Sequence, residues 1–494
     1  SNIAYTYPAT NSVARTSSSK MSDVVSVKDF GAVGNGTTDD TVAIQNAINS
    51  LGSKGGMVYL PLGNSYYIGS NLTINKSVTL VGPYDYAGAN GSNASEPYGD
   101  LSAVILNSSA TITLKAGAGI TGCFIYRYGM TFPTVNSSAF AGTAITGGGD
   151  DYFVTNCFII GFNQAIYSTG YSRPRIYNNY LDCQNGIWID NCVDVSRIRD
   201  CHAWPFATIQ AVTAGTAGAS LNRSGYGFNF TTADDAGQVS GCLALGYSVG
   251  FRVNSCNGLT FLNCDAEGFN VLGSGVTGYK IDGGSSANVL IGCQTYGCDI
   301  QVYSNSNTVP NIPTQIIGCT LGGGGNGSIG IEVDSAGDVI VIGGIINGVT
   351  NGVLVNNSNS DVNLTSILFK DITGHPLFAN AVNGNIIINN CVWGDAGAGA
   401  EFSAGANAGI PSISSAAILS PTPNRNFFNV TGSTTVTGGV YGGYADRTVT
   451  FKFVDGLTFN NGGSLPNSVR LQNNSNYTFG AGATLTLTHD GYQW

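Results

Sequence analysis

The chain has 494 residues, of which 70 are Gly and only 10 % are charged. Ordinary globular proteins contain about 7 % Gly and about 25 % charged residues, so this composition excludes coiled coils and helical solenoids. A hydrophobic content of 43 % excludes a disordered chain, and a net charge of −10 without a Lys/Arg run argues against nucleic-acid binding. No apolar segment is long enough to cross a membrane, so no membrane insertion is predicted.

The first predicted element is a helix between Thr38 and Gly52. Thr38 and the two Asp residues after it place capping oxygens and negative charge at its N-terminus. Its apolar face consists of Ile44, Ala47, Ile48 and Leu51. Such a helix covers the open end of a stack of strands, which would begin with a strand at Met57–Leu60. The alternative is a loose polar helix on the surface.

Short apolar segments then recur about every 22 residues. When these segments are aligned, one column contains Cys157, Asn179, Cys201, Cys242, Cys264, Cys293, Cys319, Gly344, Ser366 and Cys391. A second short strand, such as GIWID or GFRVN, follows in most units and is bounded by Gly and Asn. Two or three strands per repeat of this length predict one coil of a parallel β-helix.

The twelve Cys residues are explained by this column. The sequence has no C-x-x-C motif and only three His, which argues against a metal site, and no cofactor is predicted. Equivalent positions in successive coils stack about 4.8 Å apart, so the column predicts buried, small, apolar Cys side chains rather than disulfides. Asn precedes the column at Asn156, Asn178, Asn263 and Asn390, which predicts left-handed turns there.

One segment carries a family resemblance. DFGAVGNGTTDDTVAIQNAI, at Asp29–Ile48, resembles the N-terminal signature of the pectate-lyase-like right-handed β-helix superfamily, and within it that of bacteriophage tailspike depolymerases. Residues Ser12–Asp29 resemble the short neck that precedes this signature. The C-terminal segments RTVTFKFVDGLTF and GAGATLTLTHDGYQW resemble the β-rich ends of phage fibre proteins.

The resemblance implies an all-β, right-handed parallel β-helix that assembles as a homotrimer on the virion. It further implies binding and cleavage of a bacterial surface polysaccharide, namely a capsule, an exopolysaccharide or an O-antigen. A missing N-terminal domain would attach the protein to the phage tail or baseplate.

Four segments are expected. Residues 1–27 form a neck, 28–56 a capping segment with the helix, 57–403 the β-helix, and 404–494 a β-rich domain for trimerisation or carbohydrate binding. Residues 404–423 are rich in Gly, Ala, Ser and Pro, and the alternation from Asn426 to Trp494 is typical of antiparallel strands.

Hydrolysis of a glycan requires a proton donor and a second carboxylate, so acidic residues on outward positions are the catalytic candidates. If the Cys column points inward, residues one and three positions later point outward. Asp265 and Glu267 then share one face of one strand, about 6.6 Å apart along it. That spacing is near the range of roughly 6.5–9.5 Å expected for an inverting pair, and side-chain freedom also allows the shorter retaining distance.

Other candidates lie on nearby coils. Asp200, Asp182 and His202 are further candidate catalytic residues. Trp204, Tyr296 and Phe206 offer aromatic faces to sugar rings, and Arg252 offers a charge to an acidic sugar. Two long steps in the repeat flank the Asp265 coil, and such insertions build the walls of binding grooves.

Three functions remain open at this stage. The leading hypothesis is a hydrolase that uses paired carboxylates. The second is a polysaccharide lyase that acts by β-elimination with a Tyr, Lys or His base. The third is a glycan-binding fibre without catalysis.

Overall fold

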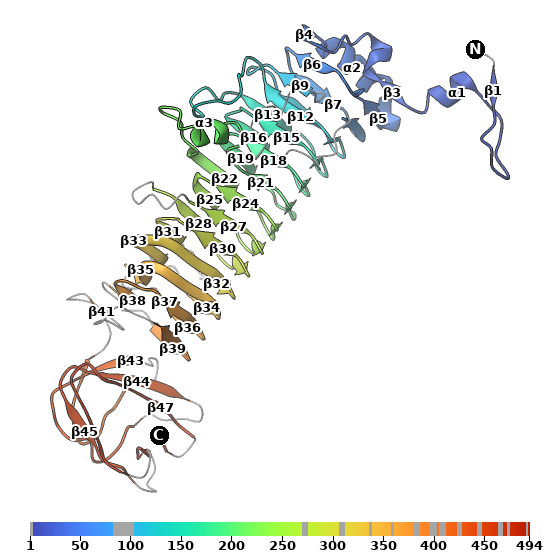
Figure 1. Cartoon of the computed structure of the whole chain (residues 1–494). Coiled ribbons are helices and arrows are strands. Elements are labelled where there is room, and N and C mark those ends of the chain that lie inside the picture. Colours follow the sequence, from blue (N-terminus) through green and yellow to red (C-terminus); the bar gives the residue numbers. More distant parts are fainter. Residues whose placement is uncertain are drawn as a thin grey trace. The chain divides into compact units, whose positions relative to one another are not determined.

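The computed structural model describes residues 3–82, 103–268, 275–305, 312–334, 338–356, 360–379, 386–394, 403–404, 412–421, 427–441, 447–462, 468–471, 475–490 and 493–494. The chain forms two compact units, one containing residues 1–269 with 274–280 and the other residues 270–273 with 281–494. Figure 1 labels many of their strands and helices.

The first unit consists of coils of three short strands. One column of strands contains β3 (Val25–Ser26), β5 (Gly56–Tyr59), β8 (Val78–Val81), β11 (Gly119–Thr121), β14 (Phe153–Thr155), β17 (Arg175–Tyr177), β20 (Arg197–Arg199), β23 (Gln238–Ser240) and β26 (Thr260–Leu262). The second contains β4 (Asn35–Asp39), β6 (Ser65–Ile68), β9 (Ala103–Leu106), β12 (Phe124–Arg127), β15 (Phe158–Ile160), β18 (Tyr180–Asp182), β21 (His202–Ala203), β24 (Leu243–Leu245) and β27 (Asp265–Glu267). The third contains β7 (Leu72–Ile74), β10 (Ile112–Leu114), β13 (Thr143–Gly147), β16 (Gln164–Thr169), β19 (Asn185–Asp190), β22 (Arg223–Thr231), β25 (Tyr247–Asn254) and β28 (Thr277–Asp282).

Strands of successive coils pair in parallel within each column, as in β15 with β18 and β16 with β19. The predicted all-β parallel β-helix is therefore confirmed. An antiparallel pair, β1 (Ala4–Tyr5) with β2 (Arg15–Thr16), and the short helices α1 (Ser17–Met21), η1 (Val27–Phe30) and η2 (Gly52–Lys54) also belong to this unit. In the described part of the chain, no helix has the length and hydropathy needed to cross a bilayer.

The second unit also contains columns of parallel strands. Its strands are β29 (Val289–Ile291), β30 (Gln294–Tyr296), β31 (Ile300–Ser304), β32 (Thr314–Ile317), β33 (Thr320–Val333), β34 (Val339–Ile342), β35 (Ile345–Val355), β36 (Val362–Thr365), β37 (Leu368–Lys370), β38 (His375–Ala379), β39 (Ile386–Asn389), β40 (Val392–Gly394) and β41 (Ser403–Ala404). The long strand β33 pairs with both β30 and β31, so one strand here spans two columns.

The C-terminal part of this unit has its own sheets. Strands β42 (Ser412–Ser414), β43 (Phe427–Thr431), β44 (Thr448–Phe453) and β47 (Thr484–Thr488) form one sheet, and β45 (Leu457–Phe459) pairs with β46 (Tyr477–Phe479). Strand β44 pairs antiparallel with β47 but parallel with β43, so the expected antiparallel pairing is only partly right. Alternation of apolar and polar residues indicates that one face of a strand is buried. It does not indicate whether neighbouring strands run parallel or antiparallel.

The Cys column lies inside the coils, as predicted. All twelve Cys are free, and eleven are buried. Cys201 Sγ lies 3.6 Å from the carbonyl oxygen of Ile176 in the preceding coil. Asn179 occupies the same column because its amide donates to Val154 O at 2.9 Å and accepts from Cys157 N at 2.9 Å. The Asn residues that precede the column have φ near +52°, which confirms the predicted left-handed turns.

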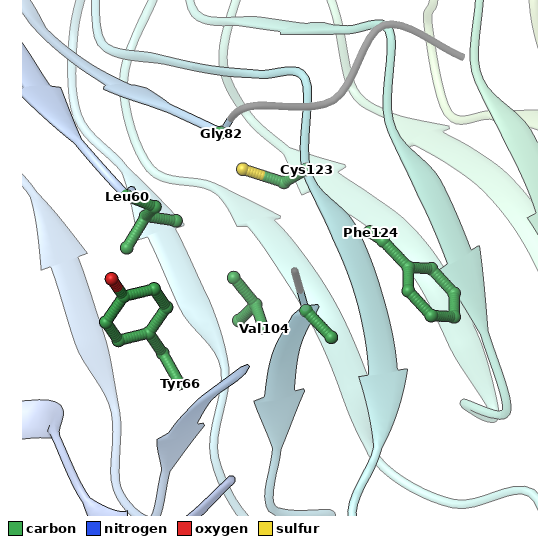
Figure 2. A pocket seen from close by; sticks show the side chains of 7 residues that line it. Leu60, Tyr66, Gly82, Val104, Cys123 and Phe124 are labelled. Carbon is green, nitrogen blue, oxygen red and sulfur yellow. The ribbon is translucent and has the colours of Figure 1, made fainter. Parts of the chain in front are cut away.

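The N-terminal helix α2 (Thr41–Ser50) buries Ile44, Ala47 and Ile48 as predicted. It begins later than expected because Thr38 and Asp39 belong to β4. The first unit also has a cavity of about 10 Å³, lined by Leu60, Tyr66, Gly82, Ala103, Val104, Cys123 and Phe124 (Figure 2). This volume holds about one water molecule, so a sugar does not fit there.

Candidate active site

Two carboxylates lie side by side on the outward face of β27. Cys264 and Ala266 of this segment are buried, whereas Asp265 and Glu267 are half-buried. Strand alternation therefore places the carboxylates outside the coil, as predicted. Strand β24 precedes β27 in register, with Leu243 beside Asp265 and Leu245 beside Glu267, so two Leu side chains flank the acidic pair on that side.

The pair is electrostatically coupled. Partial burial raises the pKa of Glu267 most, and the negative charge of Asp265 and a hydrogen bond between the two carboxyl groups raise it further. Two neighbouring carboxyl groups resist simultaneous ionisation. The arrangement therefore favours the protonated form of Glu267 more than solvent does for an isolated Glu.

His202 belongs to an aromatic cluster on the same column. It is in register with Leu243, two strands from Asp265. Its ring lies 5.4 Å from that of Trp204 and 5.6 Å from that of Phe206. Burial lowers the pKa of His202 to about 4, so the imidazole is neutral at neutral pH. At neutral pH the ring therefore lacks the imidazolium proton, and it packs between aromatic side chains.

The outward face beside this cluster is covered. Phe206 and Ala207, in the segment that leads to α3 (Ile209–Thr213), pack over it. They form one buried apolar cluster with Ala103, Ile105, Phe124, Phe140, Phe158 and Ile160. Phe206 is only 8 % exposed, so it presents little surface for stacking on a sugar, and Trp204 at the edge of the cluster is half-buried.

Asp182 lies under the same cover, so the expectation that it faces a groove is wrong. Its carboxylate accepts from Arg223 at 2.7 Å, and both side chains are fully buried. The backbone amide of Ala207 donates to the other carboxylate oxygen at 2.6 Å. Burial raises the pKa of Asp182, and Arg223 and this amide oppose the shift. These contacts indicate that Asp182 anchors the covering segment.

Asp200 occupies the turn column. It has φ of +52°, like the Asn residues at equivalent positions, and it is exposed. It lies in the turn before the inward Cys201, whereas Asp265 and Glu267 lie in the strand after the inward Cys264.

The two remaining predicted residues lie elsewhere. Arg252 is on the outward face of the third column, with its guanidinium carbon 5.1 Å from the ring centre of Tyr226. Tyr296 belongs to the second unit, where it is 54 % exposed. Sequence reasoning missed Tyr167 and Trp188, which lie on the third column with ring centres 4.9 Å apart. The signal was available, since Trp188 is at an outward position of the strand GIWID.

The second unit has a comparable acidic pair at Glu332 and Asp334. Asn356 donates to Glu332 at 2.8 Å, and the Tyr303 hydroxyl donates to Asp334 at 3.0 Å. These bonds link neighbouring strands and occupy both carboxylates. A depression of about 400 Å³ also occurs in this unit, and its lining is largely aliphatic and acidic, including Ile340 and Asp338.

Within the described ranges, no group of three or more His, Cys, Asp or Glu side chains is arranged so that it could hold a metal ion.

Parts of the chain are similar to known proteins. Residues 24–95 match the family model described as rhamnogalacturonase A/epimerase, pectate lyase-like. The tail spike protein of Shigella phage Sf6 is 36 % identical over 85 residues, which are 16 % of this chain and 14 % of that protein. A capsule K30/K69-specific depolymerase of Klebsiella phage K64-1 is 29 % identical over 154 residues, which are 25 % of this chain and 19 % of that protein. The chain thus matches less than a fifth of the length of each of these relatives.

A solved structure is similar over nearly the whole length. The tailspike protein of E. coli bacteriophage HK620, in complex with a pentasaccharide, aligns with a TM-score of 0.51 and 11 % identity, covering 98 % of this chain and 96 % of that one. At this identity the likeness supports the fold alone. The sequence matches and the fold together confirm the resemblance to pectate-lyase-like phage tailspikes.

Proposed function

We propose that this protein is a phage tailspike that binds and cleaves a bacterial surface polysaccharide by glycosidic hydrolysis. The observation that carries the proposal is the coupled pair Asp265 and Glu267 on the outer face of a β-helix. The relatives named tail spike protein and capsule depolymerase support the substrate class, since both are phage proteins and the second is named for its action on a capsule.

The chemistry assigns a separate role to each carboxyl group. Glu267, whose pKa is raised, donates its proton to the glycosidic oxygen as the bond to the anomeric carbon breaks. Asp265 is then ionised, and it either activates a water molecule or attacks the anomeric carbon directly. Leu243 and Leu245 lower the local polarity beside the pair, which strengthens the interaction between Asp265 and the developing positive charge.

The aromatic cluster of His202, Trp204 and Phe206 lies on the same column as the acidic pair. Trp204 is half-buried at the edge of the cluster, in which His202 lies two strands from Asp265. The face of an indole ring packs against the C–H face of a pyranose. A glycan that follows the second column would therefore contact Trp204 at one end and the carboxylates at the other.

The proposal includes assembly and location. In line with the resemblance to phage tailspikes, we propose a homotrimer carried on the phage tail that acts at the host cell surface. Light scattering of the purified chain measures its mass in solution, and a monomer would contradict the trimer without affecting the chemistry.

Digestion of purified surface polysaccharides from candidate host strains tests the reaction. Saturated fragments support hydrolysis, whereas an ultraviolet-absorbing C=C bond in the product identifies a lyase, and binding without fragments identifies a receptor-binding fibre. We expect Glu267→Gln to keep glycan binding and to lose cleavage by about 100-fold or more. Glu332→Gln, in the hydrogen-bonded pair of the second unit, is the matched control and should cleave normally. Full activity of Glu267→Gln would remove Glu267 from the mechanism.

A further inference from the structure

A second set of outward side chains lies on the third column, separate from the acidic pair. In register on four neighbouring strands are Tyr167 of β16, Trp188 of β19, Asn229 of β22 and Arg252 of β25. We call these four residues the third-column ladder. Their in-register neighbours one position earlier, such as Phe228 and Phe251, stack inside the coil at 4.8 Å, so the ladder points outward.

The indole of Trp188 is held in a fixed orientation. Its Nε1 donates to the Thr231 hydroxyl at 2.7 Å, and that hydroxyl donates to Asp190 at 2.7 Å. Thr169 donates to the other oxygen of Asp190 at 2.9 Å. The Asp190 carboxylate therefore accepts hydrogen bonds from two hydroxyls. The hydrogen bonds from Trp188 through Thr231 to Asp190 fix one edge of the indole. The ring of Tyr167 packs 4.9 Å from the indole ring, so the two form a preorganised aromatic surface.

Asn229 lies directly between Trp188 and Arg252 and is only 4 % exposed. Its Oδ1 is buried, and in the described part of the chain no donor lies within hydrogen-bond distance of it. A buried acceptor without a donor destabilises the native state, so such positions are rare in native proteins. A hydroxyl of a bound ligand would supply the missing donor.

Two basic residues, Arg252 and Lys280, lie on the last two strands of the same column. Arg252 lies over the ring of Tyr226, which orients its guanidinium along the surface. Phe251 stacks on Tyr279 at 4.9 Å, and Lys280 follows Tyr279 as Arg252 follows Phe251. Strand alternation thus places Lys280 on the outward face next to Arg252. In a chain of net charge −10 with 19 basic residues, two adjacent outward cations favour a local anionic ligand.

We propose that the third-column ladder binds an acidic sugar residue, a hexose that carries a carboxylate. The pyranose ring packs on Trp188, one ring hydroxyl donates to Asn229 Oδ1, and the carboxylate accepts from Arg252, with Lys280 alongside. The assignment rests on the proposed function in one respect, that the ligand is a saccharide. It adds that the polysaccharide is anionic and that it is held on a different column from the carboxylates that cleave it.

Binding of two probes of equal length tests the ladder. Tetragalacturonate carries carboxylates, and maltotetraose is neutral. Both are titrated into the full chain and followed by saturation-transfer NMR and tryptophan fluorescence. We expect tetragalacturonate to bind at least about tenfold more tightly, since charge-assisted hydrogen bonds are roughly twice as strong as neutral ones. Equal affinity for the two probes would overturn the proposal.

Variants assign the binding to the ladder. Arg252→Gln should lose about tenfold in affinity for tetragalacturonate and leave maltotetraose unchanged. Arg199→Gln is the matched control, because Arg199 lies 5.3 Å over Tyr177 in the same kind of Arg–Tyr stack on the first column. Trp188→Ala should abolish binding and Trp188→Phe should restore part of it, which separates loss of the surface from misfolding. Parent-like affinity of Arg252→Gln would overturn the proposal.

The cleavage test keeps the two proposals distinct. Glu267→Gln should bind tetragalacturonate like the parent, since Glu267 is not on the ladder. If the parent cleaves a glycan but the ladder variants bind the acidic probe unchanged, the ladder assignment fails and the hydrolase stands. If the ladder variants lose binding and no glycan is cleaved, the ladder stands and the hydrolase fails.

Discussion

Arg223 and Asp182 form an ion pair in which both side chains are fully shielded from solvent, with 2.7 Å between Arg223 Nη2 and Asp182 Oδ1. Arg223 also donates to the Thr208 hydroxyl at 3.1 Å, and Asp182 accepts from the amide of Ala207. The pair therefore ties β18 and β22 to the segment that folds over the second column. Neither partner is free to act on a substrate.

Removal of one partner should destabilise the protein strongly. Arg223→Met leaves Asp182 buried without its counter-charge, and we expect a loss of about 3–5 kcal/mol in unfolding free energy, measured by urea denaturation. Arg173→Met is the control, because Arg173 pairs with Asp151 and Asp194 at the surface and such pairs contribute at most about 1 kcal/mol. Equal losses in the two variants would contradict this account.

The coupling between Asp265 and Glu267 should be visible by titration. Asp265→Asn removes the negative charge that helps to raise the pKa of Glu267, so that pKa should fall toward its usual value. Because the proton-donor form of Glu267 is then lost at lower pH, the basic limb of any remaining activity should also move to lower pH. The chain has four Glu, so 13C labelling of Glu resolves the titration. An unchanged titration would show that the carboxyl groups are not coupled.

Asp234 should make stability depend on pH. It is fully buried and accepts from the Ser196 hydroxyl at 2.9 Å, and burial raises its pKa to about 7. Since the native state holds this proton more tightly than the unfolded state, its contribution is complete below about pH 4 and is lost as pH rises to about 7. The loss is on the order of 4 kcal/mol at most.

Asp234→Asn keeps the neutral shape of the protonated acid and does not titrate. Urea midpoints of the parent should therefore fall more between pH 5 and pH 8 than those of the variant. If both proteins lose the same stability over this range, Asp234 is not the group responsible.

The thiols should be unreactive in the native protein. Eleven of the twelve Cys are buried, and burial raises the pKa of Cys256 to about 12, so few thiolates form. We expect a thiol reagent to modify at most Cys391, the partly exposed one, before unfolding, and all twelve after addition of guanidinium. Rapid modification of several thiols in the native state would contradict the stacked interior.

The fold could be predicted because the short apolar segments of the sequence recur about every 22 residues. A column of small residues and a preceding Asn fix the inward direction and the turn of each coil, and Asp265 and Glu267 follow from simple alternation. The burial of Asp182 was not predictable, since its partner Arg223 is 41 residues away at the end of an insertion. Alternation states which way a side chain points, and it does not state what lies over it. His202 is half-buried for the same reason, and only its surroundings show that it is neutral.

The insertion between β21 and β22 does not change the register of strand pairing in the second column. His202 still pairs in register with Leu243 after the long excursion that contains α3. The register of the strands thus does not depend on the length of the covering segment. A different segment can occupy this place without moving the strands, provided that it also satisfies the buried pair Asp182 and Arg223.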